Sequence, residues 1–151
     1  MDDTHTLVTT KEIDAPVVDV WNAWRDPEKI ANWWGPAGFR STVEELDVRI
    51  GGRFKVIMHG PDGTDYPNLY VFDHVEEHRQ LIYTSAGSEE FGLAPYQSVF
   101  DLTSLGSRTR VVLEARFISE EDKRKHVEDF GAIEGSRQLL QRLEEQAKLD
   151  D

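Results

Sequence analysis

Hydrophobic positions change their spacing twice along this chain. Residues 6–13 alternate loosely between apolar or β-branched and polar side chains, which predicts a first strand. Four apolar residues between positions 17 and 24 then follow the i, i+3, i+4, i+7 spacing of one buried helical face. Asp26-Pro27 ends that helix and starts a second short one, because Asp is a good N-cap and Pro suits the first helical turn. The pattern therefore predicts one strand followed by two short helices.

Between residues 42 and 117 the apolar side chains recur at every second position, as in half-buried strands. Turn-forming sequences such as Gly51-Gly52 and Pro61-Asp62-Gly63 divide this region. Because the connections are short, we expect an antiparallel meander to which the first strand adds. The six predicted strands span residues 42–49, 53–59, 66–75, 80–86, 97–104 and 109–118. Their shared apolar face is predicted to hold Phe54, Val56, Met58, Tyr70, Phe72, Phe100, Leu102, Val111, Leu113, Ala115 and Phe117.

The last predicted element is a long helix that begins after Ser119. Ser119 suits the N-cap position, and the three acidic residues that follow it interact favourably with the helix dipole. We expect a kink near Gly131, because glycine weakens a helix locally. Helices and strands are thus segregated along the chain, which is typical of an α+β domain, and residues 1–151 are predicted to form one such domain.

The charge balance changes the list of expected partners. Asp and Glu number 29 against 17 Lys and Arg, a net charge of -12, so the average field repels nucleic acid and anionic membranes. No segment approaches the run of about 20 apolar residues that spans a bilayer, and the N-terminus lacks the pattern of a signal peptide. The absence of cysteine excludes disulfides and fits a reducing compartment. We therefore expect a cytoplasmic protein without nucleic-acid or membrane partners.

Motifs for covalent chemistry are missing from the sequence. It holds no Gly-x-Ser-x-Gly elbow, no cysteine and no phosphate-binding glycine loop, which disfavours acyl and nucleotide hydrolysis. The five histidines do not have metal-ligand spacing, so we expect neither metal nor cofactor. His59 and His74 are candidate general bases, although solvated positions at hairpin ends explain them as well.

Carboxylates on the predicted strands receive a similar interpretation. A buried carboxylate with a raised pKa can serve acid-base chemistry, yet for Glu45, Asp101 and Glu114 we expect outward, solvated positions. Asp47, with Arg49 and Arg53, is predicted to form a solvated charge cluster near a turn.

Several sequence segments together resemble a known family. Asp14-Ala15-Pro16, Trp33-Trp34-Gly35-Pro36 and the run from Asp47 to Phe54 are similar to segments of the activator-of-heat-shock-protein-90-ATPase homologue family, and the likeness covers nearly the whole chain. That family belongs to the START-like superfamily, with the birch-pollen allergen and polyketide cyclases. The resemblance implies the helix-grip fold, in which a curved antiparallel sheet of about seven strands surrounds a long C-terminal helix and encloses a hydrophobic cavity. Gly135-Ser136 stands where the family often has Gly-Trp, which implies a larger pocket.

The aromatic side chains and the implied cavity favour a binding module for a hydrophobic small molecule, such as an apolar or aromatic metabolite. We expect the ligand to enter between the loop 87–95, the corner at Trp33-Trp34 and the last helix. Adjacent tryptophans cannot both face inward from one helix, so one of this pair is predicted at the rim. A solid core would explain the same aromatic residues. The predicted ligand contacts are Trp34, Phe39, Met58, Tyr70, Phe72, Tyr83, Phe91, Phe100, Phe130, Ser136 and Leu140.

Two other functions remain open from the sequence. An enzyme similar to polyketide cyclases and aromatases would use one acid or base inside the cavity. An interaction protein would modulate a chaperone ATPase or form a homodimer through an exposed sheet face. The eukaryotic co-chaperones of the family carry an additional N-terminal domain that engages the chaperone, and this sequence begins at the first strand of the helix-grip unit, which argues against the chaperone role.

Overall fold

The structure, a computed structural model, describes residues 5–88, 90 and 92–149, with backbone only at residues 129 and 130. Its element order confirms the predicted α+β arrangement. The strands are β1 (Thr6–Ile13), β2 (Arg40–Leu46), β3 (Arg53–His59), β4 (Asp65–Glu76), β5 (Gln80–Ser85), β6 (Tyr96–Ser104) and β7 (Thr109–Phe117). The helices are α1 (Val17–Arg25), α2 (Pro27–Trp33), α3 (Glu120–Phe130) and α4 (Ala132–Lys148).

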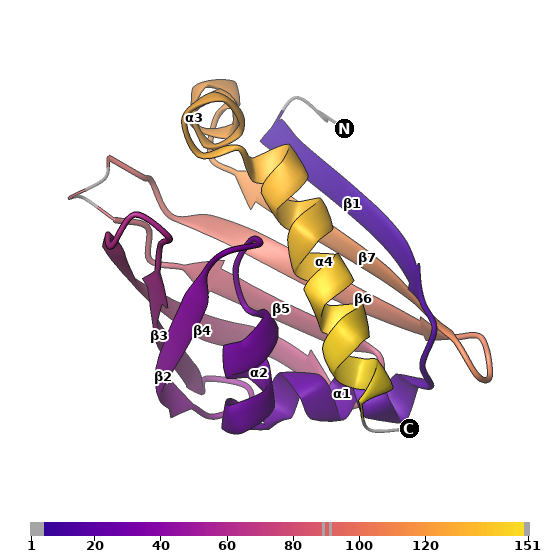
Figure 1. Cartoon of the computed structure of the whole chain (residues 1–151). Coiled ribbons are helices and arrows are strands. Elements are labelled where there is room, and N and C mark those ends of the chain that lie inside the picture. The colour runs from indigo at the N-terminus through magenta and orange to yellow at the C-terminus, as the bar shows by residue number, and fades with distance from the viewer. Residues whose placement is uncertain (1–4, 89, 91, 150–151) are drawn as a thin grey trace.

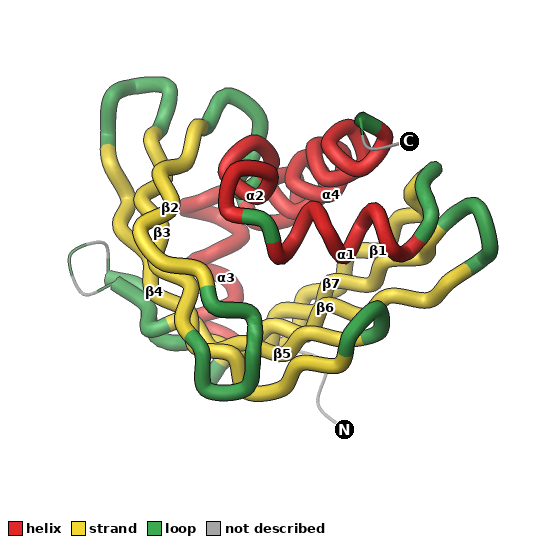
Figure 2. The backbone as a smooth tube through the Cα atoms, turned by 90° about the horizontal axis from the view of Figure 1, so that it is seen from below, coloured by secondary structure: helices red, strands yellow, loops and turns green. Residues whose placement is uncertain are grey.

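All seven strands form one antiparallel sheet in the order β1-β7-β6-β5-β4-β3-β2. This confirms the meander, with β1 added beside β7. Register shifts between Val43 and Glu45, and between Phe72 and His74, are the kind of irregularity that bends a strand. The sheet is accordingly curved: α4 crosses its concave side (Figure 1), and α1 and α2 lie across one end of the resulting trough (Figure 2).

The C-terminal helical segment differs from the prediction of one kinked helix. Gly131 has φ 62° and ψ 38°, the left-handed conformation, in which an α-helix cannot continue. The chain therefore breaks into α3 and α4, which run in clearly different directions (Figure 1). The predicted N-cap is confirmed, because the Ser119 hydroxyl accepts a hydrogen bond of 3.1 Å from the backbone N–H of Asp122. Of the two helices, α4 is the one that crosses the concave side of the sheet (Figure 1).

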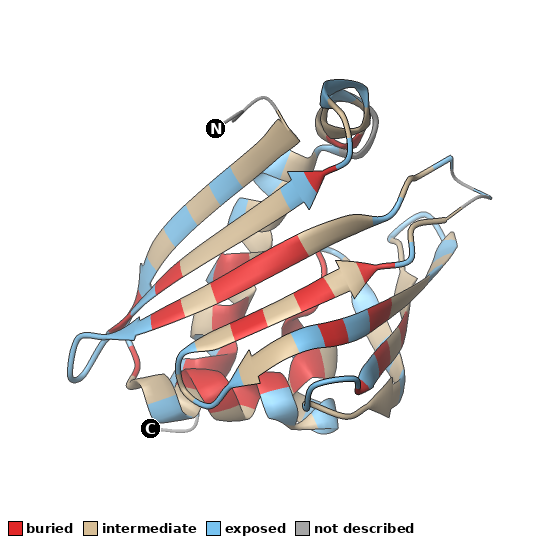
Figure 3. Ribbon diagram, turned by 180° about the vertical axis from the view of Figure 1, so that it is seen from behind, coloured by how far each residue is buried: buried red, intermediate tan, exposed pale blue. Residues whose placement is uncertain are grey.

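Trp24 lies at the centre of the core. Its ring is fully buried and is surrounded by six aromatic rings at centroid distances between 5.3 and 6.3 Å, mostly edge to face. These rings belong to Trp33, Trp34, Phe54, Phe72, Tyr83 and Phe100. Buried residues alternate with less buried ones along the strands, as the view of the opposite face shows (Figure 3). The apolar residues at every second position of the strands therefore face the core, as predicted.

Both tryptophans at the end of α2 are buried, which corrects the expectation that one lies at the rim. Trp33 is 0% exposed and Trp34 is 5% exposed. The helix ends at Trp33, and Trp34 has extended backbone angles of φ -72° and ψ 124°. Because the two residues are not on one continuous helix, both side chains can face the core. Trp33 also donates its Nε1–H to the carbonyl oxygen of Ala23 at 2.9 Å.

Candidate functional site

A cavity of about 440 Å³ continues the hydrophobic core toward one end of the trough. Two strands show how it arises. On β3, Phe54 is fully buried, whereas the inward residue Met58 is only half-buried. On β7, Val111 is fully buried, whereas the inward residue Leu113 is half-buried. The inner face of the sheet is therefore packed solid against α1, α2 and the C-terminal part of α4, and lines open space further along.

The wall of the cavity combines an apolar surface with scattered hydroxyl groups. The apolar and aromatic residues include Trp34, Phe39, Met58, Leu113, Phe117 and Leu139. The polar residues are Tyr66, Asn68, Tyr70, Tyr83, Ser85, Ser88, Tyr96, Ser98, His126 and Ser136. None of the described residues that line the cavity is Asp, Glu, Lys or Arg. In a chain whose net charge is -12 the cavity is thus a region without formal charge.

Three of the four tyrosines that line the cavity, Tyr70, Tyr83 and Tyr96, are called the cavity tyrosines below. Burial raises the pKa of each, most of all for Tyr70 and Tyr83. Side-chain hydrogen bonds with Ser98 and Ser85 act in the opposite direction on the pKa of Tyr83 and Tyr96, respectively. All three phenols consequently stay protonated at neutral pH and present hydroxyl groups that donate and accept.

His126 on α3 is the imidazole of the cavity wall. It is 8% exposed, and its ring lies 4.6 Å from Phe117 and 5.0 Å from Tyr96, centroid to centroid. Nδ1 lies 3.0 Å from the carbonyl oxygen of Asp122, which can only accept, so Nδ1 carries the proton. Burial lowers the pKa of His126, so the ring is neutral at pH 7. In that tautomer Nε2 is the basic nitrogen.

Sequence reasoning overlooked His126. Position 126 lies four residues before Phe130, one of the predicted ligand contacts, and so falls on the same face of the predicted helix. This helical spacing was the available signal. The four charged residues that precede it, Asp122 to Lys125, concealed this signal.

Arg142 fixes the loop that forms the rim of the cavity, and it was also missed. From α4, Nη1 donates to the carbonyl oxygens of Gly35 and Pro36, both at 2.9 Å. Nη2 donates to those of Asn32 at 2.7 Å and Phe39 at 3.0 Å. Gly35, Pro36 and Phe39 all line the cavity. Since a polar residue on an otherwise amphipathic helix usually faces water, no sequence pattern marked Arg142 as a structural residue.

The structure gathers most of the predicted ligand contacts around the cavity. Trp34, Phe39, Met58, Tyr70, Tyr83 and Ser136 line it. Phe72, Phe100 and Leu140 are instead at most 1% exposed and belong to the packed core. Phe91 lies outside the described residues, as does the side chain of Phe130. We therefore assign the candidate site to the first six residues, together with Tyr96, Ser85, Ser98 and His126.

The remaining candidates lie outside the cavity. His59, His74, Glu45, Asp101 and Glu114 are not among its lining residues. No group of His, Asp or Glu residues in the described part of the chain has the arrangement of a metal site. None of the described helices is long and apolar enough to cross a membrane.

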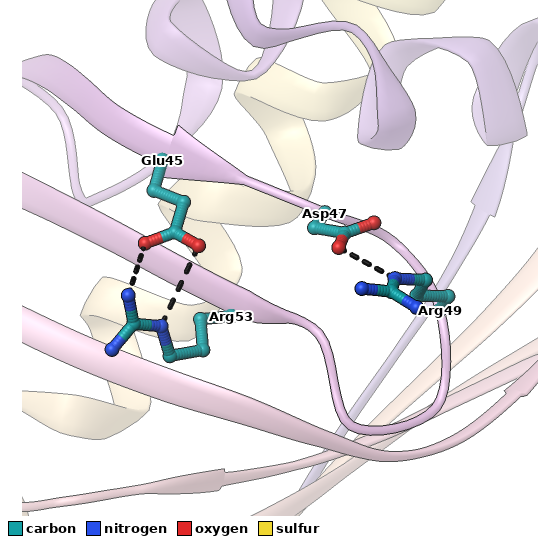
Figure 4. Close-up of polar contacts among 4 residues, drawn as sticks. All are labelled: Glu45, Asp47, Arg49 and Arg53. Carbon is teal, nitrogen blue, oxygen red and sulfur yellow. Dashed lines mark hydrogen bonds and ion pairs between the residues drawn. The ribbon is translucent and has the colours of Figure 1, made fainter.

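The predicted charge cluster at the β2–β3 turn is two separate ion pairs. Arg49 pairs with Asp47 at 2.6 Å, and Arg53 pairs with Glu45 at 2.8 Å (Figure 4). Arg53 pairs instead with Glu45, which lies opposite Lys55 on the neighbouring strand and is therefore a diagonal neighbour of Arg53. Because both pairs are solvated, they contribute little to stability.

Comparison with solved structures places the chain among proteins of the same architecture. A protein from Arthrobacter aurescens is 28% identical, with a TM-score of 0.87 over 98% of this chain and 89% of that chain. A protein from Nitrosomonas europaea is 26% identical, with a TM-score of 0.85 over 100% and 99%. One from Mycobacterium smegmatis is 31% identical, with a TM-score of 0.82 over 94% and 90%.

Sequence comparison identifies the family. No curated protein matches the chain significantly. The model of the family described as "Activator of Hsp90 ATPase homolog 1-like protein" matches residues 14–148, which is most of the sequence. The helix-grip fold and this match agree with the resemblance found in the sequence. The chain belongs to the activator of Hsp90 ATPase homolog 1-like family.

Proposed function

We propose that the cavity binds an uncharged, mainly apolar or aromatic small molecule that carries one or two hydroxyl or carbonyl groups. The observation that carries this proposal is the lining, which has no formal charge but several hydroxyl groups. An ionised ligand would lose its hydration there without gaining a counter-charge, which is costly. A neutral ligand would lose little hydration free energy and would gain hydrogen bonds to the cavity tyrosines. As the sequence predicts, we place this role in the cytoplasm.

The dimensions of the cavity support the same class of ligand. A volume of about 440 Å³ lies within the range of about 300–1,000 Å³ found for small-molecule sites. Apolar contact with residues such as Trp34 and Leu139 would supply most of the affinity, at about 25 cal/mol per Å² of buried apolar surface. The hydroxyl groups would orient the ligand, because an unpaired polar group in such a site is unfavourable.

His126 favours an enzymatic role as the second candidate. Its proton is fixed on Nδ1 by the carbonyl oxygen of Asp122, so Nε2 is the nitrogen that can take up a proton. A single base of this kind fits an intramolecular ring closure or proton shift, as in polyketide cyclases. Turnover of a bound ligand that His126→Gln abolishes without weakening binding would support this role over simple binding.

Native mass spectrometry of the protein purified from its own host tests the leading proposal. Ser136 lines the cavity, so Ser136→Trp should fill part of it, whereas Ser107→Trp on an exposed turn is the matched control. We expect a reproducible small-molecule mass on the wild type and on Ser107→Trp, and much less on Ser136→Trp with unchanged circular dichroism. Equal occupancy of all three proteins would contradict the proposal.

A further inference from the structure

The outer face of the sheet brings a hydroxyl, an imidazole and a carboxylate into line. Thr42 lies on β2, His59 ends β3, and Asp65 begins β4. Thr42 Oγ1 is 2.7 Å from His59 Nε2, and His59 Nδ1 is 2.7 Å from Asp65 Oδ1. None of the three lines the cavity, so the cluster is separate from the site described above.

The strand register explains this alignment. Asp65 lies directly opposite His59 across β3 and β4. Arg40 lies opposite His59 across β2 and β3, and Thr42 follows two residues later on the same face of β2. Thr42 is thereby a diagonal neighbour of His59, within reach of its ring. The three side chains come from strands that the sheet holds rigidly.

The hydrogen-bond direction matches that of an activated nucleophile. An ionised carboxylate only accepts, so Asp65 accepts from His59 Nδ1–H. With the ring proton on Nδ1, Nε2 is the acceptor, and Thr42 Oγ1–H donates to it. A hydroxyl that donates to an imidazole, which in turn donates to a carboxylate, is the arrangement of nucleophile, base and orienting group in acyl-transfer enzymes.

We propose that Thr42, His59 and Asp65 form a second site, which transfers acyl groups from small carboxylic esters to water. Thr42 Oγ attacks the ester carbonyl carbon while His59 Nε2 takes the hydroxyl proton. The bond to the alcohol oxygen then breaks, and the departing alcohol receives that proton. Water attacks the acyl-threonine with His59 again as base, so the acid leaves and Thr42 is restored. Ester and water are consumed, and acid and alcohol are formed.

Neighbouring residues suit an ester substrate. Thr42 is exposed, so its hydroxyl is accessible to a dissolved molecule. Arg40 is exposed and lies opposite His59, where its positive charge favours the oxyanion that forms during attack. Ile57 lies opposite Thr42 and offers apolar contact to an acyl chain. Because the site is open to water, we expect an acceleration of about 10²-fold, the lower end for general-base catalysis.

Hydrolysis of p-nitrophenyl acetate tests the proposal, with rates followed by absorbance and acetylation located by peptide mass spectrometry. Thr42→Val keeps the side-chain shape but removes the hydroxyl, whereas Thr42→Ser keeps a hydroxyl. We expect acetylation at position 42 in the wild type and in Thr42→Ser. Thr42→Val and His59→Gln should lose it and hydrolyse the ester at least about tenfold more slowly. Asp65→Asn should slow hydrolysis because the carboxylate that sets the tautomer is gone.

His74→Gln controls for catalysis by any surface imidazole. His74 is also partly exposed and also has a carboxylate neighbour, with Nε2 3.5 Å from Glu76 Oε2. Its loss should leave the rate unchanged. The proposal would be overturned if Thr42→Val hydrolysed the ester at the wild-type rate or if no acetyl group were found on Thr42. It would also be overturned if His74→Gln lost as much of the hydrolysis rate as His59→Gln. A drop in stability of Thr42→Val at an unchanged rate would assign the three residues to structure alone.

Discussion

Replacing Arg142 tests whether one guanidinium holds the rim of the cavity in place. The group donates four hydrogen bonds to backbone carbonyls between residues 32 and 39, at 2.7–3.0 Å. Within the loop, Gly35 and Gly38 have φ values of 101° and 87° that few other residues adopt, and the backbone N–H of Phe39 donates to the carbonyl oxygen of Pro36 at 3.1 Å. Gln138 adds one bond, from the backbone N–H of Ala37 to Oε1 at 3.0 Å.

The magnitude follows from these bonds and from their exposure. A hydrogen bond to a charged group contributes about 1.5–3 kcal/mol, and contributions within one group are not additive. Arg142 is half-buried, so water partly replaces the lost donors. We therefore expect Arg142→Met, which keeps the apolar stem, to lower the free energy of unfolding by about 2–4 kcal/mol. Arg142→Lys should lower the free energy of unfolding less than Arg142→Met does, because an ammonium group can still donate to some of the four carbonyls.

Urea unfolding followed by tryptophan fluorescence measures both variants. Arg137→Met is the matched control, because Arg137 lies on the same helix and makes only an exposed pair with Glu134 at 3.6 Å. Its loss should cost at most about 0.5 kcal/mol. The reasoning is refuted if Arg142→Met unfolds within about 0.5 kcal/mol of the wild type. It is also refuted if Arg142→Lys and Arg142→Met are equally destabilised.

Three further predictions concern protonation and backbone space. Burial lowers the pKa of His126, so the unfolded chain binds its proton more readily, and stability should fall as pH drops from about 6.5 through the folded pKa; urea unfolding should show a weaker decline in His126→Gln. Burial raises the pKa of the cavity tyrosines, so folded protein should lose stability above about pH 10, and phenolate absorbance should appear together with unfolding. Gly52→Ala would drive its Cβ into the carbonyl oxygen of Asp47, so in thermal melts it should destabilise more than Gly51→Ala, where the space is open and only the positive φ of 83° opposes alanine.

The fold could be predicted from local patterns because the sheet has one apolar face and short connections. Period-two spacing and turn residues placed all seven strands, and Asp26 and Ser119 marked helix starts as predicted. The predicted extent of the last helix was wrong, because a single residue changes the direction of the backbone there. Gly131 adopts a left-handed conformation and separates two helices, which composition alone does not distinguish from a kink.

The site was harder to predict because its decisive features depend on distance in space. Aromatic residues fill the core and line the cavity with the same chemistry, so Phe72 and Tyr70 were indistinguishable by sequence although only Tyr70 reaches the cavity. Arg142 gains its role through acceptors more than 100 residues earlier. Thr42, His59 and Asp65 are likewise brought together only by the fold, because their alignment needs the register of three strands.

The measurement that tests the account most directly compares two ligands of one shape and different charge. Isothermal titration with 1-naphthol, neutral at pH 7, and with 1-naphthoate, an anion, asks whether the cavity selects uncharged molecules. We expect saturable binding of 1-naphthol, weakened in Ser136→Trp, and binding of 1-naphthoate at least about tenfold weaker, because the described wall holds no cation to pair with a carboxylate. Equal or tighter binding of 1-naphthoate, or no binding of 1-naphthol, would contradict this expectation.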